Sequence, residues 1–216
     1  MNTTIPSGIT NGLKIISKYN SIALIIRHSI RGEILHGQLG NDVTLTHEGK
    51  KLAVTLGQLI GDRIRTITSS PITRCTETAN CILDGAGLNY KVTTTRLLGD
   101  PGIFISDGSV AWQNFQALGT SGVMMHLANK NHALPGMRTP QEAARELLGA
   151  ILQPNTEPGI HLYVTHDVIL SGIVGQLIGG ITSKEHLPGY LDGAFFWREG
   201  QQTFGSYRDK KTLLKL

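Results

Sequence analysis

Three short segments of the chain combine histidine with arginine, hydroxyl or carboxylate side chains. They are RHSIR at 27–31, TSSPITR at 68–74 and THD at 165–167. A guanidinium group binds phosphate oxygens through a planar fork of N–H donors. An imidazole nitrogen can attack phosphorus and carry the phosphoryl group covalently. Together the three segments predict a cationic phosphate site that contains a histidine nucleophile.

Each of these segments begins where a run typical of a buried strand ends. The runs are SIALIIR at 21–27, IRTITS at 64–69 and GIHLYVT at 159–165. The carboxyl ends of parallel strands meet at one edge of a sheet, and ligands of α/β proteins bind beyond that edge. We therefore expect the three segments to converge on one site.

Helical patterns alternate with these strands along the 216 residues. The expected helices are 9–19, 46–61 with Thr46 as its cap, 71–83 ended by Gly85 and Gly87, 141–152 after Thr139 and Pro140, and 167–179. The expected further strands are 91–98 and a hairpin of 194–198 with 202–207 at the sheet edge. This alternation indicates an α/β fold with a mostly parallel sheet.

Four motifs in this order resemble the histidine phosphatase (phosphoglycerate mutase-like) superfamily. They are Arg27-His28-x-x-Arg31, LTHEGKKLAVTLGQLI at 45–60, SSPITRCTETA at 69–79 and YVTHD at 163–167. The resemblance implies a three-layer sandwich in which helices flank the central sheet. It also implies one domain over residues 1–216, with a lid-like insertion at about 99–139.

The resemblance further implies a role for each matching residue. His28 is the expected nucleophile that becomes phosphohistidine. Arg27, Arg74 and His166 are expected to bind the phosphate, and Arg31 to add a fourth donor. Two hydroxyl residues of the motifs are expected to be structural, and these are Ser70 and Thr78.

Expulsion of an alkoxide at neutral pH needs a proton donor, and two carboxylates compete for that role. Asp167 directly follows His166, in a pair that resembles the acid phosphatase branch of the superfamily. Asp100 precedes Pro101 and Gly102, which resembles an acidic position in some phosphatase members. Both residues remain candidates for the general acid.

Ser29 departs from the pattern of the superfamily, which usually has glycine after the nucleophilic histidine. A serine there either crowds the phosphate or donates a further hydrogen bond to it. Because serine is small and polar, we expect the hydrogen bond, and Ser29 is therefore a candidate phosphate ligand.

The insertion is rich in apolar side chains and holds few cations. The apolar residues are Phe104, Trp112, Phe115, Met124 and Met125, and the cations are Lys130 and Arg138. These side chains either favour a phosphomonoester with an apolar or aromatic group, or form the insertion's own core. The segment 190–200 is expected to contribute another wall to the site.

Composition excludes several classes of protein. The net charge of +4 includes no basic run longer than two residues, so neither nucleic acid nor a membrane surface is an expected partner. Cys75 and Cys81 lie too far apart on one helix for a disulfide, and the N-terminal residues lack a signal peptide pattern, so we expect a cytoplasmic protein. The remaining histidines show no metal-ligand spacing, and they are His36, His47, His126, His132, His161 and His186.

These patterns together predict a phosphatase that hydrolyses a small phosphomonoester through phosphohistidine, with no cofactor and no metal. Two alternatives stay open. One is a phosphotransferase or mutase of the same superfamily, which would need more cations for a second phosphate. The other is a non-catalytic protein that binds a phosphorylated ligand.

Overall fold

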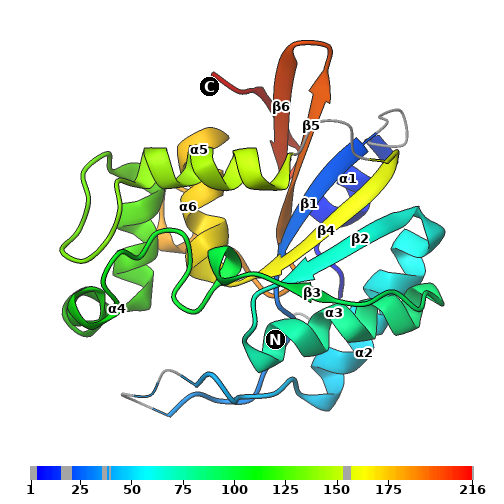
Figure 1. The fold of residues 1–216 in the computed structure, drawn as a ribbon, viewed down its shortest axis with the longest axis horizontal. Coiled ribbons are helices and arrows are strands. Elements are labelled where there is room, and N and C mark those ends of the chain that lie inside the picture. Colours follow the sequence, from blue (N-terminus) through cyan, green and yellow to red (C-terminus); the bar gives the residue numbers. More distant parts are fainter. Residues whose placement is uncertain (1–3, 16–20, 36–37, 39, 153–156, 216) are drawn as a thin grey trace.

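The computed structural model describes residues 4–15, 21–35, 38, 40–152 and 157–215. Its described strands form one seven-stranded sheet in the order β3-β2-β4-β1-β5-β6-β7 (Figure 1). The strands are β1 (Ser21–Arg27), β2 (Ile64–Ser69), β3 (Thr93–Thr94), β4 (Gly159–Thr165), β5 (Gly193–Glu199), β6 (Gln202–Tyr207) and β7 (Lys210–Leu213). The first four strands of this order run parallel, and β5, β6 and β7 are antiparallel to their neighbours. The predicted α/β fold is therefore confirmed, with a sheet that is mixed.

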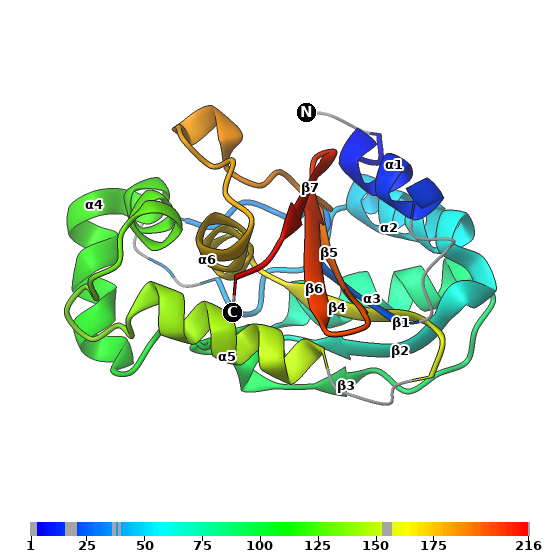
Figure 2. The same cartoon turned by 90° about the horizontal axis from the view of Figure 1, so that it is seen from above.

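Helices cover both faces of the sheet and form the outer layers of the predicted sandwich (Figures 1 and 2). The α-helices are α1 (Ser7–Ile15), α2 (His47–Ile60), α3 (Thr73–Ala86), α4 (Gly108–Asn129), α5 (Pro140–Ile151) and α6 (Asp167–Leu177). One core packs α1, α2 and α3 against the sheet, and a second core packs α4, α5 and α6 against the other face. None of the helices in the described part of the chain combines the length and apolarity that crossing a bilayer requires.

The central strand β1 shows why this sequence folds as it does. Its five inner residues, Ile22 to Ile26, are all buried. Their side chains alternate between the two faces, so Ala23 and Ile25 lie in one core and the other three in the second core. A continuous apolar run is typical of such a strand, because both of its faces are covered.

The strand ends that carry the motifs lie side by side, as expected. Arg27 at the end of β1 is in register with Thr165 at the end of β4, and Ser69 of β2 is in register with Val164 of β4. The main chain continues this pairing by one residue, because His28 N donates to Thr165 O over 2.9 Å. This register places the three predicted segments at one edge of the sheet.

Several predicted elements need correction. Only Thr93–Thr94 of the predicted strand 91–98 pairs with the sheet, and Arg96–Leu98 forms a 3-10 helix (η3) instead. Gly85 lies inside α3, where a Cβ would lie 2.0 Å from Val54 O on α2, and Gly87 alone ends the helix in the left-handed conformation. The predicted helix 9–19 is confirmed to Ile15, and residues 16–19 fall outside the described residues.

Other corrections concern helix and sheet ends. Thr139 precedes α5 as expected, but its side chain makes no capping hydrogen bond. The strand β7 was not predicted, and it displaces the hairpin β5–β6 from the edge of the sheet.

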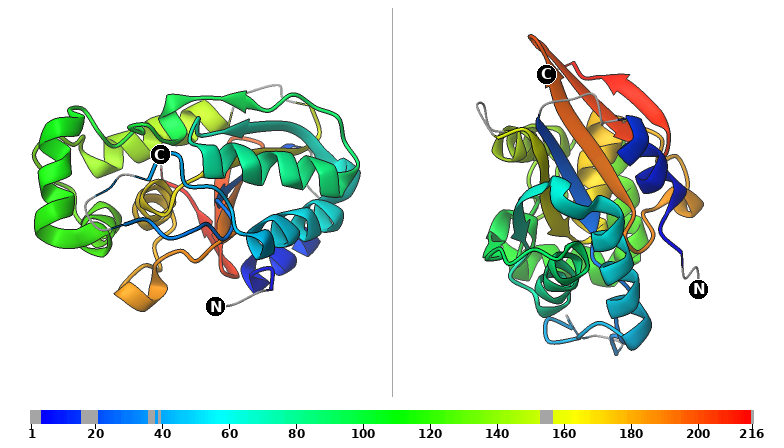
Figure 3. Two further views of the ribbon diagram at one scale, coloured as in Figure 1. Left: turned by 90° about the horizontal axis from the view of Figure 1, so that it is seen from below. Right: turned by 90° about the vertical axis from the view of Figure 1, so that its right-hand side faces the viewer.

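The insertion contains α4, which lies at one end of the molecule and far from α2 (Figure 3). Non-helical dihedral angles at Gly119 kink α4, so it consists of two short helices, as the sequence predicts. Phe104 and Met124 are buried in the core beside α6, and Trp112 stacks on Phe115. Phe104 and Met124 therefore belong to a core of the insertion, whereas Trp112, Phe115 and Met125 are half-buried.

Candidate active site

His28 follows β1 directly and is almost fully buried, with 2 % of its surface exposed. Its Nδ1 lies 2.8 Å from Ser29 O, and because a carbonyl only accepts, Nδ1 carries the proton. Burial, followed by the charges of His166 and Arg27, lowers the pKa of His28 well below its ordinary value. The ring is therefore neutral, and Nε2 keeps the lone pair that a nucleophile needs.

Arg74 joins the two histidines of the site. It lies in the first turn of α3, is 8 % exposed, and donates Nε–H to His28 Nε2 over 3.2 Å. Its Nη2 lies 3.2 Å from His166 Nδ1, and its Nη1 donates to Gly40 O over 2.7 Å. Burial lowers the pKa of Arg74 from its ordinary value, yet a guanidinium stays charged in proteins. The arginine thus holds a positive charge directly beside the nucleophile.

His166 occupies the residue before α6 and faces His28, with 5.5 Å between the ring centroids. Its Nδ1 faces the Arg74 donor, so Nε2 carries the proton and donates to Ser70 Oγ over 3.0 Å. Burial and then the Arg74 charge lower the pKa of His166 to about 3. This second imidazole is therefore also neutral, with its ring fixed at both nitrogens.

Arg27, the last residue of β1, contributes a second guanidinium. Its Nη2 forms an ion pair of 2.8 Å with Asp167 Oδ2, and its Nη1 donates to Pro188 O over 2.8 Å. The guanidinium stacks over the Tyr190 ring at 4.3 Å from the centroid. Its Nε is buried and has no hydrogen-bond partner among the described residues, so one donor remains for a ligand.

Ser29 and Arg31 are placed differently from each other. Ser29 Oγ donates to Gly49 O over 2.7 Å, so the structure turns this hydroxyl toward α2 and not toward the imidazoles. This differs from the expected phosphate contact, because a buried hydroxyl takes the carbonyl that lies nearest to it. Arg31 Nη1 donates to Gly32 O over 2.7 Å, and its charge helps to lower the pKa of Arg74, after burial.

The two carboxylate candidates also differ. Asp167 belongs to the cluster, because it pairs with Arg27, and its Oδ1 accepts from Val168 N over 2.9 Å. Asp100 has an exposed side chain that pairs with Arg96 at 3.6 Å. The residue before it, Gly99, packs against the site: a Cβ there would lie 2.6 Å from His166 Nε2. The main chain of this loop therefore reaches the cluster, whereas the exposed Asp100 carboxylate pairs with Arg96 outside it.

Three residues of the site have contacts that the sequence did not reveal. Tyr190, in the segment expected to form a wall, lies 5.8 Å from His28 between ring centroids. Cys75 places its Sγ 3.5 Å from His166 Nε2, and burial raises the pKa of this thiol to about 12. Thr78 accepts from Ser29 N over 3.0 Å and donates to Arg74 O, a structural role as expected.

Within the described ranges, no three His, Cys, Asp or Glu side chains gather where they could hold a metal ion. His36, one of the histidines that lack metal-ligand spacing, lies outside the described residues. Both cysteines are free, as their spacing predicts. The arrangement as a whole is a neutral imidazole whose Nε2 lone pair accepts a hydrogen bond from the Arg74 guanidinium, with the charge of Arg27 also close to the ring. Such a site can hold the oxygens of a phosphate while nitrogen attacks phosphorus.

Comparisons with known proteins identify the family and support the fold. The family model described as "Histidine phosphatase superfamily (branch 1)" matches residues 24–187. A search of curated proteins found no match. Among solved structures, "Mycobacterial hydrolase 1" is similar, with a TM-score of 0.56, 17% identity, and coverage of 89% of this chain and 95% of that chain.

Two further solved structures have a similar fold. One is a mycobacterial glucosyl-3-phosphoglycerate phosphatase, with a TM-score of 0.55, 17% identity, and coverage of 89% of this chain and 96% of that chain. The other is a phosphoserine phosphatase mutant from Entamoeba histolytica in complex with phosphoserine, with a TM-score of 0.52, 17% identity, and coverage of 90% and 95%.

Proposed function

The chain belongs to the histidine phosphatase superfamily (branch 1), and from that premise we propose that it hydrolyses a small phosphomonoester through phosphohistidine at His28. In the first step a bond forms between His28 Nε2 and phosphorus, and the bond from phosphorus to the ester oxygen breaks. The leaving oxygen takes a proton from a general acid. In the second step water attacks the phosphohistidine, inorganic phosphate leaves, and Nε2 regains its lone pair.

One observation carries this proposal: His28 Nε2 is unprotonated and lies 3.2 Å from the Arg74 Nε donor. The lone pair of the proposed nucleophile and the cation that would bind the phosphate oxygens thus lie side by side in the free protein. Arg27 offers its unpartnered Nε, and Arg31 and His166 complete the proposed set of phosphate ligands. Ser29 is left out of this set, because its hydroxyl is bonded to Gly49. All these groups belong to the protein, so the proposed reaction uses no metal and no cofactor.

For the general acid we propose Asp167 in its protonated form, because its carboxyl group lies in the cluster, 2.8 Å from Arg27 Nη2. The side chain of Asp100 is 43% exposed and pairs with an arginine outside the cluster. The Asp167 proton would return from water during the second step.

The proposed substrate is a small phosphomonoester. Two of the similar structures carry names of enzymes that act on such compounds, a glucosyl-3-phosphoglycerate phosphatase and a phosphoserine phosphatase. Phe104 and Met124 are buried in the core and cannot contact a leaving group, so a preference for an apolar leaving group would rest on the half-buried Trp112, Phe115 and Met125. A cytoplasmic location also remains a proposal, and the two free cysteines are compatible with it.

The test is turnover of p-nitrophenyl phosphate in the presence of a chelator, by the wild-type protein and by His28→Ala. We expect the variant to lose at least about 10³-fold in kcat, because the proposed nucleophile is gone. His47→Ala, which changes an exposed histidine, is the matched control and should keep wild-type activity. Rapid quenching should trap acid-labile, base-stable phosphate on His28. Equal rates for wild type and His28→Ala would rule out the proposed enzyme and favour a phosphate-binding protein.

A further inference from the structure

A short segment between α6 and β5, residues 188–192, contacts Arg27 in three ways. Pro188 O accepts from Arg27 Nη1 over 2.8 Å, and Asp192 O accepts from the Arg27 main-chain N–H over 2.9 Å. The ring of Tyr190 lies over the guanidinium, 4.3 Å from the ring centroid to Cζ. The family match ends at residue 187, so this segment begins directly after it. The proposed phosphate ligand at the end of β1 is thus held by residues that are distant from it in sequence.

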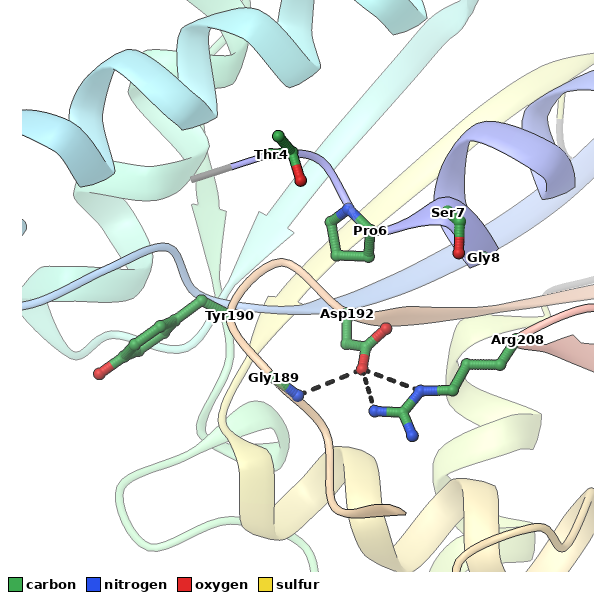
Figure 4. Close-up of a pocket in the computed structure, with 8 residues that line it drawn as sticks. All are labelled: Thr4, Pro6, Ser7, Gly8, Gly189, Tyr190, Asp192 and Arg208. Atoms are coloured by element: carbon green, nitrogen blue, oxygen red, sulfur yellow. Dashed lines mark hydrogen bonds and ion pairs between the residues drawn. The ribbon is translucent and has the colours of Figure 1, made fainter. Parts of the chain in front are cut away.

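The segment is anchored on the side that faces away from the phosphate site. Asp192 has a side chain that is only 7% exposed, and its Oδ2 accepts from Arg208 Nε over 3.1 Å and from Gly189 N over 3.2 Å. Figure 4 shows both contacts, and in the same view Tyr190 points away from them. The ion pair therefore fixes the main chain of the loop without using the Tyr190 side chain.

Leu191 supplies the turn between these two side chains. Its φ of 55° lies in the left-handed region, which residues with a β-carbon disfavour. The Leu191 side chain is completely buried in the core that packs α1, α2 and α3 against the sheet. Burial thus maintains this conformation, in which Leu191 enters the core while its neighbour Tyr190 lies over Arg27.

The contacts of the Arg27 guanidinium leave one defined donor. Nη1 is bonded to Pro188 O, and Nη2 is paired with Asp167 at 2.8 Å. Nε is buried and has no hydrogen-bond partner within the described ranges. Because a guanidinium donates in its own plane, the orientation of that plane decides where the Nε–H points. The Tyr190 ring covers one face of the plane and so restricts both its rotation and the access of water.

The same ring also lies beside the proposed nucleophile. The centroids of the Tyr190 and His28 rings are 5.8 Å apart, and the ring planes are inclined by 50°. Both this contact and the contact with Arg27 are made by the aromatic ring. An aromatic face attracts a cation, which an aliphatic side chain of similar size does not. Phenylalanine should therefore replace Tyr190 at this position, and leucine should not.

We propose that Tyr190 is a positioning residue of the phosphate site, whose ring holds the Arg27 guanidinium so that its Nε–H faces the bound phosphate. This inference rests on the proposed function, because it deepens the role of Arg27 as a phosphate ligand. Tyr190 acts through Arg27 and takes no part in making or breaking bonds.

The orientation of Arg27 is measured without turnover, by NMR of the labelled full chain. The observable is the order parameter of the Arg27 Nε–H bond, whose signal is assigned by its absence from Arg27→Lys. We expect about 0.85, as in a rigid backbone, for wild type and Tyr190→Phe, and less than about 0.6 for Tyr190→Leu. Tyr90→Leu makes the same change at an exposed tyrosine after α3 and should keep the wild-type value.

Phosphate binding and kinetics separate a positioning role from a structural one. We expect Tyr190→Leu to raise both the Kd of inorganic phosphate, measured by calorimetry, and the KM for p-nitrophenyl phosphate about tenfold. Its kcat should change by less than about threefold, because Arg27 binds the phosphate in the substrate complex and in the transition state alike. Tyr190→Phe and Tyr90→Leu should keep all three constants within about twofold of wild type.

The outcomes distinguish this inference from the proposed hydrolysis. If wild type does not hydrolyse p-nitrophenyl phosphate, the proposed hydrolysis is wrong, and the order parameter and the phosphate Kd still decide the role of Tyr190. The positioning role is overturned if Tyr190→Leu keeps the wild-type order parameter or the wild-type Kd, or if Tyr190→Phe loses as much as Tyr190→Leu. A lower kcat with unchanged KM in Tyr190→Leu would show a structural role only, and would also overturn it.

Discussion

Arg74 donates its Nε–H to His28 Nε2 over 3.2 Å, so the guanidinium is hydrogen-bonded to the lone pair that the proposed reaction uses. A phosphoryl group that enters the site must come between these two atoms. The guanidinium then exchanges the imidazole for phosphate oxygens, which are the stronger, charged acceptors. The same contact therefore fixes the nucleophile in the free protein and supplies the cation to its substrate.

Replacement of Arg74 should show how much its guanidinium group contributes to the rate of hydrolysis. We expect Arg74→Lys to lower kcat/KM for p-nitrophenyl phosphate by about 10² to 10³-fold, since one ammonium cannot reach His28, Gly40 and His166 together. Arg65→Lys, an arginine on the surface of β2, is the control and should keep wild-type kinetics. The measurement is steady-state kinetics of wild type and both variants, and urea unfolding compares their stabilities. Wild-type kcat/KM in Arg74→Lys would contradict the assigned role.

The two buried imidazoles should make stability depend on pH. Burial lowers the pKa of His28 well below its ordinary value and that of His166 to about 3. Both groups titrate near 6.5 in the unfolded chain, so between about pH 6.5 and pH 3 the unfolded chain binds more protons than the folded one. The free energy of unfolding is therefore highest above pH 6.5 and falls as the pH is lowered through this window.

Urea unfolding at about pH 7.5 and about pH 5 measures this loss. His166→Gln should lose less stability than wild type over this interval, by up to about 2 kcal/mol, because one shifted group is gone. His186→Gln, at an exposed histidine, should lose as much as wild type. An identical pH dependence in wild type and His166→Gln would show that His166 does not have the lowered pKa.

Periodic patterns in the sequence predicted most of the fold. The strands β1, β2 and β4 have the expected bounds, because each is a run of β-forming residues that leads directly into a motif. The prediction of a strand over 91–98 was wrong for most of its length, because β propensity does not show whether a neighbouring strand is available for pairing. Only Thr93 and Thr94 pair with β2. The strand β7 was missed because its residues, KKTL, show no apolar alternation.

The sequence predicted which residues lie at the site where a motif follows a strand. It did not predict the direction in which an individual side chain points. The motifs correctly brought His28, Arg74 and His166 together. The direction of Ser29 depended on a carbonyl of α2, which lies 20 residues away in the chain. The pairing of Asp192 with Arg208 has no local pattern either, because it joins a loop to the turn after β6.

The direction of the Ser29 hydroxyl leads to a test. Ser29→Ala removes the 2.7 Å hydrogen bond to Gly49 O and should lower the free energy of unfolding by about 1 kcal/mol. Its kcat/KM for p-nitrophenyl phosphate should stay within about twofold of wild type, because the hydroxyl does not face the imidazoles. Urea unfolding and steady-state kinetics give both numbers. A tenfold loss of activity at unchanged stability would instead restore Ser29 as a phosphate ligand.

Substrates with different leaving groups show which residue is the general acid. An alkoxide needs a proton more than a nitrophenolate does, so the acid matters most for alkyl phosphates. We expect Asp167→Asn to lower kcat for glycerol 2-phosphate by about 10²-fold or more and kcat for p-nitrophenyl phosphate by less than about tenfold. Asp100→Asn is the matched variant and should treat both substrates alike. If Asp100→Asn discriminates between them and Asp167→Asn does not, Asp100 is the acid.

Ser70 should control which nitrogen of His166 carries the proton. In the free protein Arg74 donates to His166 Nδ1, so Nε2 donates to Ser70 Oγ over 3.0 Å. When phosphate takes the place of the arginine, Nδ1 must become a donor. A hydroxyl can both accept and donate, so Ser70 can then turn its own hydrogen toward Nε2. It is thus a positioning residue that allows either tautomer of His166 without an unpaired nitrogen.

Ser70→Ala should lower kcat about tenfold, because the His166 ring then loses the partner that stabilises the Nδ1–H form. Nitrogen chemical shifts of the His166 ring in the presence of vanadate, a phosphate analogue, should show Nδ1–H in wild type and a mixture of tautomers in Ser70→Ala. Ser69→Ala is the control, since Ser69 is an equally buried hydroxyl that donates to Ser70 O and does not contact His166. A purely structural role for Ser70 would lower stability in both variants and leave the tautomer of His166 unchanged.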